Sequence, residues 1–192
     1  LHRLWRARWA AIGAAVAVAI GAGGIYVGHA ADVPPTSSFV TIAPVRILDT
    51  RSNLGLSGPF TSLASRDLLL TGVIATIFGD DIVLPTGASA VSLNVTVVGP
   101  TASGFLSVRP ANAAGAPTTS SLNFTAGEVI PNAVTVSLPR TGADTGKIEI
   151  TYDAFGVAGP TTHVLIDVVG YYMPDDKATT LALSPASFTA SN

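Results

Sequence analysis

The chain has 192 residues, of which 48% are hydrophobic and 11% are charged, and this balance excludes a disordered polar tail. It contains no cysteine, which excludes disulfide bonds and thiolate metal sites, so stability must come from a hydrophobic core. The net charge is −2; without Arg3, Arg6 and Arg8, seven basic residues face twelve acidic ones, giving −5. The basic residues after the first eight positions do not cluster into a basic stripe, which argues against nucleic acid as a partner.

Residues 1–30 have the pattern of an export signal or a membrane anchor. The three N-terminal arginines precede an uncharged apolar run at residues 9–27, and Gly28 and Ala30 provide the small residues of a signal-peptidase site. We expect cleavage after Ala30, or else an uncleaved hydrophobic helix, because about 20 apolar residues span a bilayer. Either outcome places the rest of the chain outside the cell or on its surface. Residues 31–38 are polar and Pro-rich and are expected to form a linker.

Residues 39–173 are expected to fold as one all-β module. Short apolar runs are broken by Gly- and Pro-containing turns about every dozen residues, a spacing typical of an antiparallel β-sandwich, of which a jelly roll is one form. In residues 90–97, Val91, Leu93, Val95 and Val97 fall on one face and Ser92, Asn94 and Thr96 on the other, so one face of that strand should point into a core. Residues 74–83 would fit a short helix or a long loop. The expected strands are residues 39–42, 45–49, 67–73, 90–98, 104–108, 121–125, 133–138, 147–152 and 164–172.

The sequence SLNVT at residues 92–96 returns as SLNFT at residues 121–125. Two strands would therefore present Ser, Asn and Thr on one face and apolar groups on the other. The simpler interpretation is that these side chains face solvent or bond within the sheet, as any half-buried strand requires. The functional alternative is a polar ladder that hydrogen-bonds a sugar or another strand. The candidate binding residues are Asn94, Asn123, Tyr171 and Tyr172.

Asp167 interrupts an apolar run at residues 164–169 that predicts a central strand covered on both faces. A carboxylate in such a strand needs a cation or several N–H donors, because an unpaired buried charge costs several kcal/mol. Arg46 and Arg51 are the candidates, and they would lie on opposite faces of an extended strand. We predict a structural ion pair between Arg51 and Asp167. The alternative is a carboxylate that binds a ligand or metal.

The motifs also resemble a known but uncharacterised module. It recurs in secreted and surface proteins of actinobacteria and other bacteria, and the resemblance spans residues 39–173. It implies an accessory or surface-binding role, frequently beside extracellular hydrolases, but no defined ligand or site residues. The segments that carry the resemblance are PVRILDTR (44–51), LNVT (93–96), GFLSV (104–108), SLNF (121–124), Asn132 and DVVGYY (167–172).

No catalytic pattern stands out in residues 31–192, so we expect no enzyme activity and no cofactor. His163 is the one histidine of this region, and Ser103 lacks the glycine pattern of a nucleophile elbow. The carboxylates fall mostly in expected turns, where Asp bonds the local backbone, rather than forming a glycosidase pair. No spaced calcium-loop motif occurs, and we expect no metal site. The carboxylates considered are Asp80, Asp81, Glu128, Asp144, Glu149 and Asp153.

The expected function is therefore a non-catalytic, extracellular binding or adhesion module that recognises a cell-envelope polymer, a polysaccharide or a surface protein. Alternatives are a structural spacer or self-associating surface-layer element, and the accessory domain of a secreted hydrolase whose catalytic domain lies elsewhere. Both tryptophans, Trp5 and Trp9, fall in the leader, which weakens the case for sugar binding and favours protein contact. Residues 174–192 are expected to be a linker and the start of a truncated further β domain. Together with the start at Leu1, this suggests an incomplete reading frame.

Overall fold

The computed structural model describes residues 36–76 and 81–175, and within them the chain forms strands and no helix. None of these residues belongs to a helix that could cross a membrane. The expected leader helix at residues 9–27 and the expected further domain near the C-terminus lie outside the described residues. The strands are β1 (Ser37–Asp49), β2 (Phe60–Thr61), β3 (Arg66–Leu69), β4 (Gly72–Ile74), β5 (Ile82–Leu84), β6 (Ala90–Val98), β7 (Gly104–Pro110), β8 (Leu122–Phe124), β9 (Val129–Ser137), β10 (Lys147–Asp153) and β11 (Thr161–Pro174).

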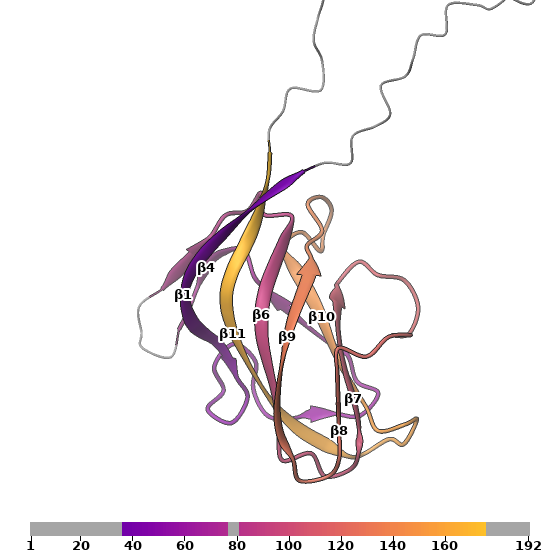
Figure 1. Ribbon diagram of the computed structural model, residues 1–192. Coiled ribbons are helices and arrows are strands. Elements are labelled where there is room, and N and C mark those ends of the chain that lie inside the picture. Colours follow the sequence, from indigo (N-terminus) through magenta and orange to yellow (C-terminus); the bar gives the residue numbers. More distant parts are fainter. Residues whose placement is uncertain (1–35, 77–80, 176–192) are drawn as a thin grey trace, which may run out of the picture. The chain divides into compact units, whose positions relative to one another are not determined.

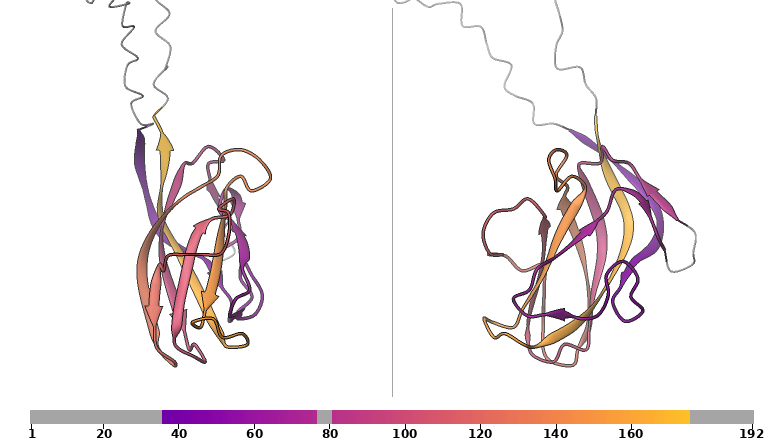
Figure 2. Two further views of the ribbon diagram at one scale, coloured as in Figure 1. Left: turned by 90° about the vertical axis from the view of Figure 1, so that its right-hand side faces the viewer. Right: turned by 180° about the vertical axis from the view of Figure 1, so that it is seen from behind.

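All strand pairs are antiparallel, and the two larger sheets share one core in a β-sandwich-like arrangement (Figures 1 and 2). Figure 1 looks onto the five-stranded sheet, in which β1, β11, β6 and β9 run from left to right and β2 pairs with the beginning of β11. The second sheet has the order β3-β10-β7-β8. A two-stranded sheet, β4-β5, completes the described fold. The expectation of an all-β, antiparallel fold is confirmed.

The alternation of apolar and polar residues along a strand explains which face of each sheet points into the core. In β6, Val91, Leu93, Val95 and Val97 are buried, while Ser92, Asn94 and Thr96 lie on the outer face. The other sheet contributes the buried side chains of Leu106, Ile148, Ile150 and Tyr152 to the same core. Fully burying side chains of this size contributes about 1.5–3 kcal/mol each, which accounts for the stability of a domain without disulfides.

Several strand boundaries differ from the sequence-based prediction. The two segments expected at 39–42 and 45–49 form one long strand, β1, with an irregularity between Thr41 and Val45. The strand expected at 67–73 divides into β3 and β4, because Gly72 adopts a φ of 87° that turns the chain. The segment expected at 74–83 to be a helix or long loop has both its ends in strands, because Ile74 of β4 pairs with Ile82 of β5.

Strands β1 and β11 are neighbours along most of their length, and this places the beginning and end of the domain side by side. Ser37 pairs with Pro174, and the Asp175 N–H donates to the Thr36 carbonyl at 2.8 Å. The Ser38 hydroxyl donates to the Asp175 carboxylate at 2.6 Å. The turn between β10 and β11, residues 154–160, lies at the opposite end of β11 (Figure 1). We call the end of the sandwich that contains Ser37 and Pro174 the proximal end, and the end that contains residues 154–160 the distal end.

Candidate functional site

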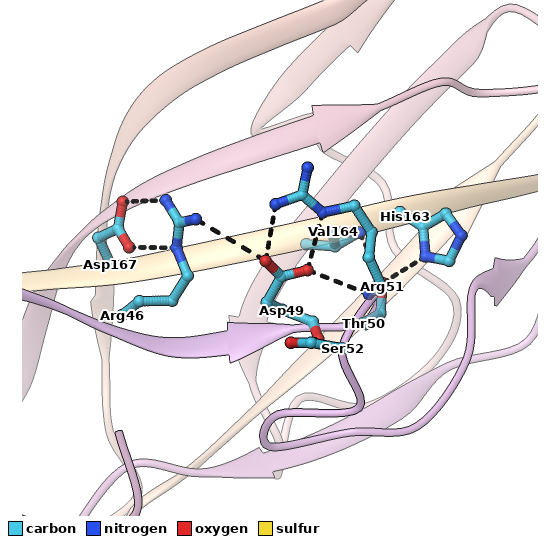
Figure 3. A network of polar contacts seen from close by, with 8 residues as sticks. All are labelled: Arg46, Asp49, Thr50, Arg51, Ser52, His163, Val164 and Asp167. Atoms are coloured by element: carbon cyan, nitrogen blue, oxygen red, sulfur yellow. Dashed lines mark hydrogen bonds and ion pairs between the residues drawn. The ribbon is translucent and has the colours of Figure 1, made fainter. Parts of the chain in front are cut away.

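The PVRILDTR motif ends β1 in a network of charged side chains (Figure 3). Arg46 Nε donates to Asp167 Oδ1 at 2.8 Å, and Nη2 donates to Oδ2 at 3.1 Å. The third nitrogen of Arg46, Nη1, lies 3.8 Å from Asp49 Oδ2. The bond to the Asp167 carboxylate raises the pKa of Arg46, against the opposing effect of burial. Arg46 therefore links two carboxylates, one on its own strand and one on β11.

The predicted pair between Arg51 and Asp167 is wrong. Arg51 instead donates to Asp49, through Nε at 2.9 Å, Nη2 at 2.7 Å and the backbone N–H at 3.0 Å. These side-chain bonds, the largest effect, hold the pKa of Asp49 below its ordinary value, although burial acts in the opposite direction. The strand register explains why Arg46, and not Arg51, pairs with Asp167, because Arg46 lies directly opposite Asp167. A register shift between Arg46 and Leu48 also places Arg46 on the same side of the strand as Asp49.

The prediction that Asp167 lies on a central strand is confirmed, but the strand is not sealed on both faces. β11 lies between β1 and β6, and the Asp167 side chain retains 20% of its exposure on the outer face. Thr50 completes the junction: its hydroxyl accepts the Val164 N–H at 3.0 Å and lies 2.9 Å from His163 Nδ1. The side chains of this motif join β1 to β11, and these bonds occupy most of their polar atoms. We interpret the network as architecture.

The four candidate binding residues do not form one site. Asn94 lies on the outer face of the five-stranded sheet, in register with Asp167. Asn123 lies on β8, in the other sheet, and is exposed. Tyr171 packs against the core, whereas Tyr172 contacts Phe39 in a tilted arrangement with ring centroids 4.9 Å apart. The repeated SLN sequence therefore marks two strands in two different sheets.

Asn123 belongs to a second polar and aromatic arrangement that sequence reasoning missed. On the outer face of the four-stranded sheet, Phe105 of β7 is in register with Asn123 on one side and Asp153 of β10 on the other. Residues opposite each other in an antiparallel pair point to the same side, with Cβ atoms about 4.5–5.5 Å apart. An aromatic ring is thus flanked by an amide and a carboxylate in a row across three strands.

Phe155 extends this row at the distal end of the domain. Its ring centroid lies 6.3 Å from that of Phe105, and its side chain is 70% exposed. Phe155 and Gly156 occupy the centre of a tight turn with φ angles of 53° and 82°. A turn with two positive φ angles favours Asn and Gly, and a left-handed conformation costs a residue such as Phe about 1–2 kcal/mol. We call Phe105, Asn123, Asp153 and Phe155 the aromatic surface.

A second strained apolar residue lies beside this surface. Leu63 has a φ of 70° and is 50% exposed, and its N–H donates to the Tyr152 carbonyl at 2.8 Å. The turn that contains it is fixed to the Phe155 turn, because the Ala154 N–H donates to Ser62 Oγ at 2.9 Å. Strained non-glycine residues gather at functional sites more than elsewhere, and here two of them expose apolar side chains. The signal in the sequence was the dipeptide Phe155-Gly156 between two strands.

The described residues show no catalytic constellation. His163 is bonded to Thr50, whereas Ser103 Oγ accepts the Ala126 N–H at 3.3 Å, and no hydrogen bond between these two candidates occurs in the described part. Glu149 is paired with Arg109 at 2.7 Å, and Glu128 accepts the Thr125 N–H, which lowers the pKa of this exposed carboxylate. Across residues 36–76 and 81–175, no three His, Cys, Asp or Glu side chains converge as metal ligands.

Searches against known protein families, curated proteins and solved structures found no match to this chain.

Proposed function

We propose that the domain is a non-catalytic extracellular binding module that recognises a polysaccharide of the cell envelope through its aromatic surface. One observation supports this most directly: Phe155 keeps an exposed aromatic ring in a left-handed conformation, beside Phe105, at the distal end of the domain. Exposed rings next to hydrogen-bonding groups suit ligands that have both an apolar face and hydroxyl groups. The leader-like residues 1–30 support a location outside the cell.

The position of the first and last strand ends of the domain favours binding over a spacer role. A spacer lengthens a chain when its ends lie far apart, but here Ser37 and Pro174 are paired across β1 and β11. The turn at residues 154–160 lies at the end of the domain away from Ser37 and Pro174, where it is free of the paired strand ends (Figure 1). Phe155 lies in this turn.

The proposal predicts that binding and stability respond in opposite directions at Phe155. Phe155→Asn should raise the melting temperature, since Asn tolerates positive φ, and should abolish co-sedimentation of the chain with insoluble cell-wall polysaccharide. Val83→Asn is the matched control, because Val83 is 68% exposed on β5 and lies outside the aromatic surface. Unchanged co-sedimentation of Phe155→Asn, or an equal loss in Val83→Asn, would count against the proposal.

A further inference from the structure

The aromatic surface has a chemical preference that can be derived from its charges and hydrogen-bonding groups. We propose that it binds the uncharged pyranose units of a glycan and disfavours anionic polymers, an inference that rests on the proposed function. Phe105 and Phe155 provide the apolar contact for a sugar ring face. Asn123 and Asp153, on either side of Phe105, provide the polar contacts to its hydroxyl groups.

The polar groups of the surface retain free bonding capacity. Asp153 Oδ1 accepts the Gly156 N–H at 2.7 Å, and no hydrogen bond to Oδ2 occurs within the described residues. Asn123 Nδ2 donates to Ser120 Oγ at 3.1 Å, and its carbonyl oxygen accepts no hydrogen bond from that part of the chain. A carboxylate accepts hydrogen bonds from sugar hydroxyls, whereas an amide can donate and accept. These are the complementary groups that a neutral hydroxylated ligand needs.

The charges on this face disfavour an anionic ligand. Asp67 is in register with Glu149, and Glu149 with Arg109, so these side chains share the outer face of the four-stranded sheet. The two basic residues of the face are already paired, Arg109 with Glu149 at 2.7 Å and Lys147 with Asp144 at 3.6 Å. Asp67 and Asp153 form no ion pair within the described residues. A phosphate- or carboxylate-bearing polymer would therefore meet unpaired negative charge.

Titrations with soluble tetrasaccharides test this preference on the purified full chain. Cellotetraose and chitotetraose are the uncharged probes, tetragalacturonate is the anionic one, and chemical shifts or heats of binding give the affinities. We expect an uncharged probe to bind with an affinity that changes little with salt, and tetragalacturonate to bind at least about fivefold more weakly at low ionic strength. Phe155→Asn should abolish binding, and Asn123→Ala should weaken it about two- to tenfold, the usual effect of one hydrogen bond.

A charge-neutralising variant separates the preference from the proposed function. Asp153→Asn, which preserves shape, should weaken binding of the uncharged probe severalfold and reduce the discrimination against tetragalacturonate. Asp81→Asn serves as the control, because Asp81 is exposed next to β5 and lies outside the four-stranded sheet and the aromatic surface. Phe155-dependent binding that favours the anionic probe would overturn the preference and leave the proposed function standing. If the chain binds neither these probes nor cell-wall polysaccharide, or binds a protein through Phe155, both proposals are wrong.

Discussion

The pairing of Arg46 with Asp167 makes a prediction that can be worked out quantitatively. Asp167→Ala removes two charge-assisted hydrogen bonds, at 2.8 and 3.1 Å, between β1 and β11. A hydrogen bond to a charged group contributes about 1.5–3 kcal/mol when shielded, while an exposed ion pair contributes about 0–1 kcal/mol. The two side chains retain 28% and 20% exposure, so water replaces part of what is lost. We therefore expect a destabilisation of about 1–2 kcal/mol, intermediate between those limits.

Thermal unfolding and a double-mutant cycle test the assignment. For a domain of about 140 residues, each kcal/mol shifts the melting temperature by about 3–5 °C, so Asp167→Ala should lower it by about 3–10 °C. Arg46→Ala and Asp167→Ala should be non-additive by about 1 kcal/mol, whereas Arg51→Ala and Asp167→Ala should add within about 0.5 kcal/mol. Strict additivity for Arg46, or clear coupling for Arg51, would show that the pairing is incorrect. An Asp167→Ala protein of unchanged stability would show that the network does not join the strands.

Two further predictions concern the network and the core. The pKa of Asp49 in the folded protein is below its ordinary value of 3.8, so its pairing stabilises the fold above about pH 4, and this contribution is lost as the pH falls through the lowered pKa. Asp49→Asn should accordingly destabilise at neutral pH. In denaturant titrations its difference from the wild type should shrink as the pH is lowered below about 4; a constant difference would contradict this. Gly104→Ala should cost about 1–3 kcal/mol, because its Cβ would collide with the backbone carbonyl of Asp153 and lie 2.9 Å from the Tyr152 ring. Gly87→Ala, with 3.7 Å to Met173, should be tolerated in the same melting experiment. Equal melting temperatures for the two glycine variants would refute the packing argument.

The local pattern predicted strands well where alternation was regular. The bounds of β6, residues 90–98, agree with the prediction because apolar and polar residues alternate from Val91 to Val97 without a break. The same local pattern says nothing about the sheet to which a strand belongs. Asn94 and Asn123 stand in nearly identical sequences, yet they lie in different sheets, since partner strands are chosen by long-range packing.

The wrong choice of arginine has a specific physical cause. In a regular extended strand, Arg46 and Asp49 would point to opposite faces, and Arg51 would share a face with Asp49. The register shift between Arg46 and Leu48 breaks this alternation, and Ile47 and Leu48 are both buried in succession. Bulges of this kind depend on the partner strand, so the sequence of β1 alone does not reveal them.

The most recognisable motif and the best candidate site lie in different places, and energetics explains why. Charge-assisted hydrogen bonds hold Arg46, Asp49 and Asp167, and these bonds stabilise the fold by more than the entropy lost in ordering the side chains. Few of their polar atoms remain available to a ligand. Phe155 has the opposite character, because it costs the backbone about 1–2 kcal/mol and leaves 70% of its side chain exposed. A non-glycine residue that adopts a positive φ although its side chain gains little burial indicates a role other than folding. Function in this domain is therefore to be sought first at the distal turns rather than in the motif that makes the sequence recognisable.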